Sequence, residues 1–164
     1  MSKNLHPIIE RIGTILQTKG LMLVTAESCT GGWVAEAITS VPNSSLYFER
    51  GFVTYSNAAK IEMLGVQQET LQKHGAVSEE IAQEMAEGAV KNSHAQVSLA
   101  ITGIAGPSGG TQEKPVGTIC FGWQLPHQIS KISTQYFQGD RAAIRLQSVE
   151  FALEELLVLL SQLG

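Results

Sequence analysis

A hydroxyl group beside a pair of glycines follows the first apolar strand predicted along this chain. The stretch is LVTAESCTGGW, Leu23 to Trp33, and a helix is predicted to begin at about Thr30. The first amides of such a helix, from Thr30 to Gly32, lack intrahelical partners and can bind an anion. Ser28 is therefore a candidate nucleophile beside an oxyanion-binding turn. The alternative is that Ser28 or Thr30 only caps the helix, and the stretch lacks the G-x-S-x-G pattern of a nucleophile elbow.

Lys60 is the candidate base for this nucleophile, because none of the four histidines is placed to serve. Ser56 and Asn57 are N-cap candidates for a helix through AAKIEML, which puts Lys60 in its first turn. The helix macrodipole disfavours a cation there, and burial would lower the pKa of the amine further. Tyr55, at the end of the preceding strand, is placed to orient or relay a proton. The alternative is a solvated lysine on an amphipathic helix.

A second glycine-rich segment, TGIAGPSGG from Thr102 to Gly110, follows the compact apolar strand QVSLAITG. It matches neither the Walker A pattern nor G-x-G-x-x-G. Besides Gly110, it contains Gly103, Gly106 and Gly109, which indicate a loop shaped by backbone geometry. The amides of such a loop can hold a phosphate or a sugar, and a structural turn between strands is the equal alternative.

Two arginines, Arg141 and Arg145, lie four residues apart near the start of the last predicted helix, which Asp140 is expected to cap. Two cations are electrostatically unfavourable at a helix N-terminus unless an anion compensates them. Asp140 or Glu150 is one possible partner, and a substrate phosphate or carboxylate is the other.

Composition and charge limit the class of protein. The chain has 164 residues, of which 43% are hydrophobic and 16% are charged, and this predicts one globular domain over residues 1–164. A net charge of −4 argues against a protein that coats nucleic acid. The densest apolar run, LLVLL, is too short to span a membrane, and the N-terminus lacks the apolar region of a signal peptide. We therefore expect a cytoplasmic protein with no nucleic-acid or membrane partner.

The sequence indicates neither a metal site nor a disulfide framework. The histidines are scattered, and none lies at zinc-ligand spacing from a cysteine or an acidic residue. Cys29 and Cys120 are the only cysteines, and nothing marks them as a disulfide framework. We expect no metal and no cofactor.

The order of predicted elements indicates how these features are positioned. Helices and strands alternate at the front of the chain and a hairpin lies near its end, which predicts an α/β domain with three α/β/α layers around a mixed sheet. The segments AESCTGG, TYSNAAK and TGIAGPSGG each follow a predicted strand. Because ligands gather outside the carboxyl ends of strands in open α/β sheets, we expect the three segments to meet in one crevice.

Six segments, in this order, resemble the CinA C-terminal domain family. They are TAESCTGGW, VPNSSLYFERGFVTYSNAAKIEMLGV, GAVSEEIAQEMAEGAV, ITGIAGPSGG, KPVGTICFGW and FQGDRAAIR, and the resemblance runs from about residue 5 to residue 160. A single glycine-rich piece would be a weak signal, whereas this ordered set is highly specific. We expect no counterpart of the molybdopterin-binding-like domain that longer relatives carry, so its pyrophosphatase activity is not transferred.

The resemblance implies a metal-independent amidohydrolase. Stand-alone members of the family are nicotinamide-nucleotide amidases, which convert nicotinamide mononucleotide to nicotinate mononucleotide and ammonia in pyridine nucleotide salvage. The serine, tyrosine and lysine of the family correspond to Ser28, Tyr55 and Lys60, with Cys29 as the rival nucleophile. The family also implies an α/β/α fold and homo-oligomers. The alternative function is a nucleotide-binding or interaction module of the same family that has lost catalysis.

The resemblance and the local arguments together define the expected substrate site. The residues expected to bind the nucleotide are Thr30, Gly31, Gly32, Asn57, Thr102, Gly103, Gly106, Gly109, Arg141 and Arg145. Among them, the amides of residues 30–32 or of the loop at Gly103 are expected to stabilise the oxyanion. The two arginines and the loop of residues 103–110 are expected to hold the ribose phosphate.

Overall fold

A five-stranded mixed sheet forms the centre of the protein, in a computed structural model that describes residues 3–164. Its strands, in chain order, are β1 (Leu23–Glu27), β2 (Phe48–Val53), β3 (Val97–Gly103), β4 (Thr118–Gln124) and β5 (Ser130–Tyr136). Their order in the sheet is β2-β1-β3-β4-β5. The first three strands are parallel, while β4 and β5 form an antiparallel hairpin beside β3. The predicted mixed sheet is thereby confirmed.

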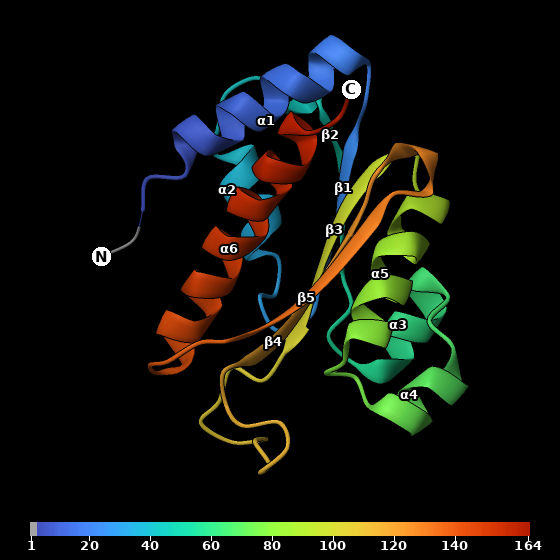
Figure 1. Ribbon diagram of the computed structural model, residues 1–164, viewed down its shortest axis with the longest axis vertical. Coiled ribbons are helices and arrows are strands. Elements are labelled where there is room, and N and C mark those ends of the chain that lie inside the picture. Colours follow the sequence, from blue (N-terminus) through green and yellow to red (C-terminus); the bar gives the residue numbers. More distant parts are fainter. Residues whose placement is uncertain (1–2) are drawn as a thin grey trace.

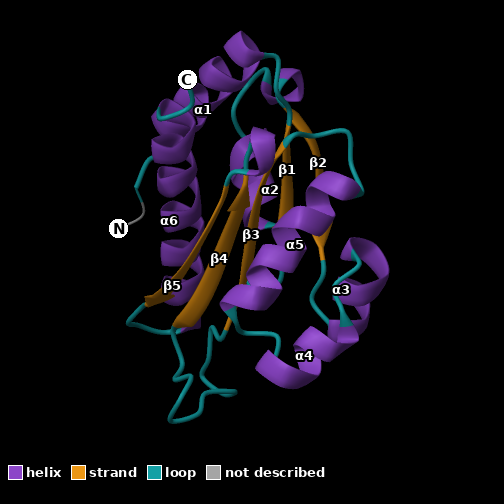
Figure 2. Ribbon diagram, turned by 45° about the vertical axis from the view of Figure 1, so that its right-hand side comes forward, coloured by secondary structure: helices purple, strands orange, loops and turns teal. Residues whose placement is uncertain are grey.

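Helices cover both faces of this sheet, so the predicted three layers are also confirmed. One face carries α1 (His6–Lys19), α2 (Trp33–Thr39) and α6 (Arg141–Ser161), and the other carries α3 (Asn57–Leu64), α4 (Gln68–His74) and α5 (Glu79–Lys91) (Figure 1). Two short 3-10 helices, Ser44–Leu46 and Pro126–Gln128, complete the elements. Figure 2 shows α5 crossing in front of the sheet, with α6 beside β5 at the left of the view.

Each layer interface has its own apolar core. Under α1, α2 and α6, the core includes Phe121 and Trp123 of β4, whose rings stack with centroids 5.6 Å apart. Under α5, the core is built from Val24, Ile81 and Met85, among other residues. Strand β1 is buried along its whole length because helices cover both its faces, which is why its sequence lacks the alternation of a half-exposed strand.

The parallel strands end together, and this alignment positions the site. Glu27 of β1 is in register with Val53 of β2 and with Ile101 of β3. The residues that follow these positions therefore emerge at the same edge of the sheet, as the sequence predicts for Ser28 and Thr102.

Short-range capping signals account for the starts of α3, α5 and α6. The Ser56 hydroxyl accepts a hydrogen bond from the Ala59 amide at 3.0 Å, and Asp140 accepts one from the Ala143 amide at 2.9 Å. The predicted start of α2 at Thr30 is wrong, since this helix begins at Trp33. Gly31 and Gly32 adopt φ values of 61° and 103°, which keep residues 30–32 in a turn outside the helix.

Across residues 3–164, no helix combines the length and the apolar character that crossing a bilayer requires.

The close approach of α5 to α3 generates a first prediction. A Cβ placed on Gly88 would overlap the backbone carbonyl of Leu64, the last residue of α3. We expect Gly88→Ala to lower the free energy of unfolding by about 1–3 kcal/mol, because the overlap outweighs the better helix propensity of alanine. Urea unfolding measures this, with Gly164→Ala as a control in open space. Equal stability of the Gly88 variant and the unaltered protein would contradict the close approach.

Candidate active site

A buried lysine lies against the Ser28 hydroxyl. Lys60 belongs to the first turns of α3 and is 1% exposed. Its Nζ lies 2.9 Å from Ser28 Oγ, 2.9 Å from the Thr54 carbonyl oxygen and 3.1 Å from the Tyr55 carbonyl oxygen. Ser28 itself is 7% exposed. The amine therefore has three polar partners, of which two are backbone carbonyls.

These three partners determine what the amine can do. Carbonyl oxygens only accept hydrogen bonds, so Thr54 and Tyr55 must each receive an N–H from Lys60. A charged ammonium donates its third N–H to Ser28 Oγ. A neutral amine instead directs its lone pair at Ser28 Oγ and accepts the hydroxyl hydrogen. In its neutral form, Lys60 is thus oriented to remove a proton from Ser28.

The environment of Lys60 favours this neutral form. Burial lowers the pKa of the amine from its ordinary value, and negative charge on Cys29 would act in the opposite direction. However, burial also raises the pKa of the Cys29 thiol to about 12. The thiol is therefore uncharged at neutral pH, and the desolvation of Lys60 is left largely unopposed.

The same thiol is the rival nucleophile that the sequence leaves open. Cys29 is 6% exposed and lines the cleft with Ser28. Because only a thiolate is strongly nucleophilic, a pKa of about 12 makes Cys29 unreactive near neutral pH. The electrostatics favour Ser28 over Cys29.

Tyr55 contacts the pair through its backbone. Its carbonyl oxygen accepts from Lys60 Nζ and lies 3.4 Å from Ser28 Oγ, while its side chain is 62% exposed. The phenol oxygen accepts a hydrogen bond of 3.4 Å from Arg141 Nη2. The structure therefore places the Tyr55 carbonyl, and not the phenol, beside the reacting groups, and proton relay by the phenol stays a prediction.

Ser28 and Lys60 open into a cleft of about 240 Å³. Four residues predicted to bind the nucleotide line it, namely Asn57, Thr102, Gly103 and Arg141. The remaining lining residues, beyond Ser28, Cys29, Tyr55 and Lys60, are Ala76, Val77 and Ala105. The cleft thus collects residues from the segments that follow β1, β2 and β3, as expected from their positions in the sequence.

The turn after Ser28 differs from the predicted anion site. Thr30 is fully buried, and its hydroxyl donates to a carboxylate oxygen of Glu27 at 2.6 Å. The Gly31 amide donates to the Ser28 carbonyl oxygen at 3.0 Å. Among the described residues, the lining of the cleft includes none of Thr30, Gly31 and Gly32. It does include Cys29, whose amide directly follows the nucleophile.

The two arginines have different surroundings. Arg141 lines the cleft and donates to the Gly106 carbonyl oxygen at 2.8 Å. Arg145 donates to the carbonyl oxygens of Cys29 at 3.0 Å and Thr30 at 3.1 Å. Its guanidinium carbon also lies 5.3 Å from the centroid of the Trp33 ring. Arg145 therefore contacts the back of the Ser28 turn and is absent from the cleft lining given by residues 3–164.

Neither carboxylate proposed as a partner for these arginines pairs with them. Within the described chain, the ion pair of Glu150 is with Lys3, and the Asp140 carboxylate caps α6. Both guanidinium groups instead donate hydrogen bonds to backbone carbonyl oxygens. Gly106 and Gly109 adopt positive φ, and both lie in the loop against which Arg141 rests.

Glu27 is the residue that sequence reasoning missed. It ends β1, is 1% exposed, and accepts hydrogen bonds from the Thr30 hydroxyl and from the amides of Val34 and Ala35. The first amides of α2 are therefore occupied by a side chain of this protein. The available signal was a lone acidic residue in an apolar strand, directly before the candidate nucleophile.

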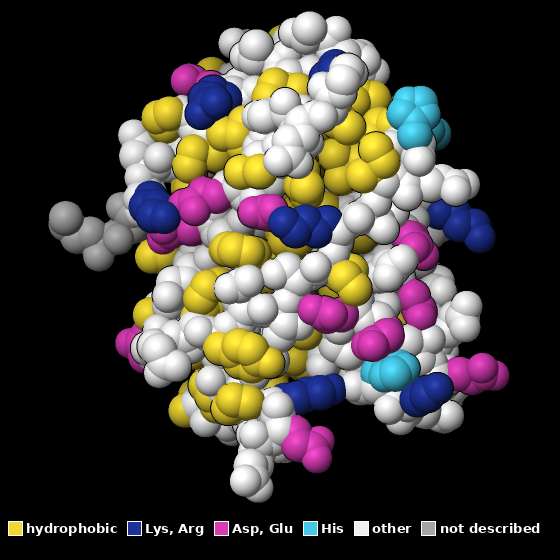
Figure 3. Space-filling model, in the orientation of Figure 1, with side chains coloured by type: hydrophobic (Ala, Val, Ile, Leu, Met, Phe, Trp, Pro, Cys, Tyr) yellow, Lys and Arg dark blue, Asp and Glu magenta, His cyan; other side chains and the backbone are white. Residues whose placement is uncertain are grey.

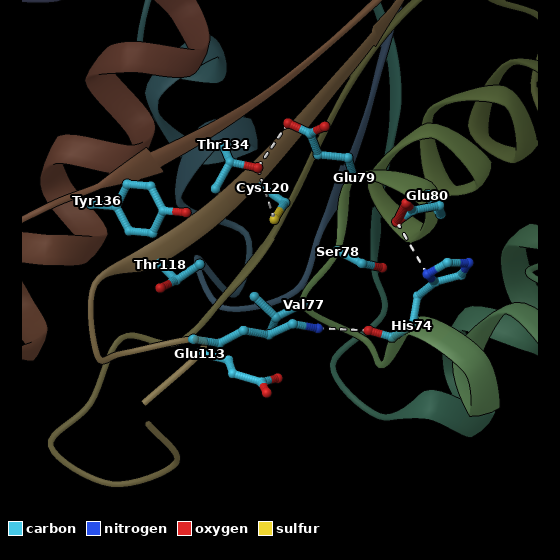
Figure 4. Close-up of a pocket in the computed structure, with 11 residues that line it drawn as sticks. His74, Val77, Ser78, Glu79, Glu80, Glu113, Thr118, Cys120, Thr134 and Tyr136 are labelled. Atoms are coloured by element: carbon cyan, nitrogen blue, oxygen red, sulfur yellow. Dashed lines mark hydrogen bonds and ion pairs between the residues drawn. The ribbon is translucent and has the colours of Figure 1, made fainter. Parts of the chain in front are cut away.

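A second, larger cavity lies next to the cleft and shares Val77 with it. Its volume is about 480 Å³, and Figure 4 shows polar side chains of α4, α5, β4 and β5 pointing into it. Lys114 also lines it and donates to the His74 carbonyl oxygen at 2.6 Å. Thr134 donates to Glu79 at 2.8 Å. Its lining includes neither Ser28 nor Lys60 in the part of the chain that the structure describes.

On the face seen in Figure 3, acidic and basic side chains are interspersed with apolar ones. Residues 3–164 contain no group of three or more His, Cys, Asp or Glu side chains arranged to hold a metal ion.

Comparison with known proteins identifies the family. The sequence profile of the CinA C-terminal domain matches residues 5–160. The chain belongs to this family. The family resemblance that the ordered motifs predict is thereby confirmed.

Three relatives illustrate the similarity. A protein of Escherichia coli K12 named nicotinamide-nucleotide amidohydrolase PncC is 50% identical over 152 residues, which cover 93% of this chain and 92% of that protein. A CinA-like protein of Chloroherpeton thalassium is 49% identical over 150 residues, 90% of this chain and 36% of that protein. The crystal structure of the competence/damage inducible protein CihA from Agrobacterium tumefaciens has a TM-score of 0.93 at 44% identity, covering 99% of this chain and 98% of that one.

The buried amine generates a prediction about stability. With a lowered pKa, folded Lys60 binds fewer protons than the unfolded chain at pH values between its folded pKa and the ordinary value of 10.5. The free energy of unfolding should therefore rise with pH in that window, by at most about 1.4 kcal/mol per pH unit. In Lys60→Met this contribution to the rise should be missing.

Urea unfolding of both proteins from about pH 7 to about pH 10 measures the difference. Lys73→Met, which removes an exposed lysine, is the control and should follow the unaltered protein. Parallel curves for the unaltered protein and Lys60→Met would mean that the Lys60 pKa is not lowered.

Proposed function

We propose that this chain is a metal-independent serine amidohydrolase that converts nicotinamide mononucleotide to nicotinate mononucleotide and ammonia. The observation that carries the proposal is the 2.9 Å contact between Lys60 Nζ and Ser28 Oγ, with two carbonyls on the other N–H groups. The substrate comes from the name of the E. coli relative, which matches over nearly the whole of both chains. An enzyme of this class needs a nucleophile and a base, and the pair supplies both.

In the first half of the reaction, Ser28 Oγ attacks the carboxamide carbon of the substrate. Neutral Lys60 takes the hydroxyl proton, and the carbonyl oxygen of the amide becomes an oxyanion. The ammonium of Lys60 then returns the proton to the nitrogen as the C–N bond breaks. Ammonia leaves, and a nicotinoyl ester remains on Ser28.

In the second half, water hydrolyses this ester. Lys60, neutral again after ammonia has taken its proton, accepts a proton from the water that attacks the ester carbon. The proton passes to Ser28 Oγ as the C–O bond breaks, and nicotinate mononucleotide is released. One lysine therefore serves as the base and then the acid in each half of the cycle.

The Cys29 amide is our candidate donor for the oxyanion. It directly follows the nucleophile, which is the position used by nucleophile-elbow hydrolases. Cys29 lines the cleft, whereas Thr30 is fully buried and the Gly31 amide is engaged by the Ser28 carbonyl. Gly103 also lines the cleft, and its amide is the second candidate donor.

The cleft is small for a whole nucleotide. Its volume of about 240 Å³ lies below the roughly 300 Å³ at which ligand pockets begin. We therefore place the nicotinamide ring inside it and the ribose phosphate at its mouth, where Arg141 and the Tyr55 phenol lie. Asn57 and Thr102 contribute polar groups along the wall. Arg145 is left out of this placement because it contacts the backbone of the Ser28 turn and does not line the cleft in residues 3–164.

The same proposal covers the setting of the reaction. It assigns the protein to pyridine nucleotide salvage in the cytoplasm, and it includes association into homo-oligomers, as the family resemblance implies. The alternative, a binding module without catalysis, would have no use for a neutral amine directed at a hydroxyl.

Removing either member of the pair tests the proposal. We expect Ser28→Ala and Lys60→Met each to lower kcat by on the order of 10³-fold or more, because the nucleophile or its base is lost. Release of ammonia and nicotinate mononucleotide from nicotinamide mononucleotide measures this, with and without a chelator. Cys29→Ala is the matched control and should stay active. Near-normal turnover by Ser28→Ala, or loss of turnover with chelator, would overturn the mechanism.

Replacing Arg141 tests the assignment of the phosphate. We expect Arg141→Ala to raise KM for nicotinamide mononucleotide by on the order of tenfold, because a charge-assisted contact is lost. Nicotinamide riboside, which has no phosphate, is the comparison substrate, and its kcat/KM should fall by a much smaller factor. Equal losses for the two substrates would show that Arg141 does not bind the phosphate.

A further inference from the structure

The carboxylate of Glu27 is buried, in the residue directly before the proposed nucleophile. Both of its oxygens accept hydrogen bonds from groups of the protein. One oxygen, Oε1, accepts from Thr30 Oγ1 at 2.6 Å and from the Val34 amide at 2.9 Å, and Oε2 accepts from the Ala35 amide at 3.1 Å. A buried carboxylate is costly unless such donors compensate it. With 1% of its surface exposed, Glu27 has no access to a substrate. It is therefore not an alternative base for Ser28.

The backbone on either side of Ser28 is held by the sheet. The Glu27 carbonyl accepts from the Thr54 amide at 2.8 Å, and the Ser28 amide donates to the Ile101 carbonyl at 2.9 Å. These two bonds extend the pairing of β1 with β2 and β3 up to the nucleophile. They fix where the Ser28 turn begins.

The Glu27 side chain fixes where the turn ends. Its contacts reach over the turn to Thr30 and to the first amides of α2. Arg145 of α6 donates hydrogen bonds to the carbonyl oxygens of Cys29 and Thr30. Gly31 and Gly32, both at positive φ, have no side chains to brace the turn. Beyond its own backbone hydrogen bonds, the turn is held by one carboxylate and one guanidinium.

We propose that Glu27 is a positioning residue, whose carboxylate holds the turn of residues 28–32 so that Ser28 Oγ faces Lys60 and the Cys29 amide faces the cleft. This inference rests on the proposed function for its catalytic consequence, although the turn can be tested without turnover. Substrate binding involves other elements, so loss of the carboxylate should affect kcat and leave KM nearly unchanged.

Glu27→Gln is the first test. The amide keeps an acceptor for Thr30 and Val34, but its NH₂ group would face the Ala35 amide, so one contact and the charge are lost. We expect kcat to fall about 10- to 100-fold with KM changed by less than about threefold. Ser98→Ala is the matched control, because it removes a buried hydrogen bond of 2.7 Å to Ala86 at the far end of β3. It should leave kcat unchanged.

Alkylation of the cysteines by iodoacetamide gives a readout that needs no turnover. Cys29 lies in the turn and Cys120 lies in β4, and both are buried. In Glu27→Gln we expect Cys29 to react about 10- to 100-fold faster, while the rate at Cys120 stays the same. Mass spectrometry of the two peptides measures each rate. Acceleration at both cysteines would indicate general destabilisation and would overturn the positioning role.

Thr30→Val distinguishes two possible causes of faster Cys29 alkylation, namely a looser turn and the lost charge of the Glu27 carboxylate. Removing the negative charge of Glu27 would by itself lower the pKa of Cys29 and speed its alkylation. Thr30→Val keeps that charge and removes only one contact, so faster reaction of Cys29 in this variant reports loosening of the turn. Unchanged Cys29 rates and unchanged kcat in Thr30→Val and Glu27→Gln would refute the inference. Absence of turnover in the unaltered protein would instead contradict the proposed function, and the alkylation rates would still test the turn.

Discussion

The contact between a desolvated amine and a serine hydroxyl is the interaction on which the rest of the site depends. Among residues 3–164, no ion pair involves Lys60, and its three hydrogen-bond partners are the Ser28 hydroxyl and two carbonyls. Burial therefore lowers the pKa of the amine by destabilising its charged form. The two carbonyls each accept one N–H of Lys60 and so orient the amine. The Ser56 cap, the end of β2 and the alignment of β1 with β2 all serve to bring this amine under the hydroxyl.

Charged side chains near the site act mainly on the backbone. Glu27 occupies the first amides of α2, and Arg145 occupies two carbonyls of the turn before that helix. Each of these bonds is stronger than one between neutral groups, because one partner carries a full charge. The turn that presents Ser28 is thereby braced from both sides, although two of its residues are glycines. Arg141 is the arginine that borders the cleft.

The predictions made from sequence were most accurate where the signal is local. Caps at Ser56 and Asp140 depend on residues three positions away, and buried strands are recognisable from apolar runs. The start of α2 was misplaced because Glu27 lies several positions before the amides that it caps, beyond the usual reach of a capping motif. Arg145 was predicted to bind a phosphate because an unfavourable cation requires a partner, and no local signal indicates that it also contacts carbonyls distant in the chain.

The sequence by itself determined the fold class, the family and the identities of Ser28 and Lys60 as candidate reacting groups. These follow from residue types, from periodicity and from an ordered set of motifs, which are properties of the chain. Only the tertiary structure decided that the amine reaches the hydroxyl, that the Tyr55 carbonyl and not its phenol lies there, and that Arg145 contacts the turn. Hydrogen bonds and desolvation depend on distances of a few ångströms between groups far apart in the chain, and packing alone sets those distances.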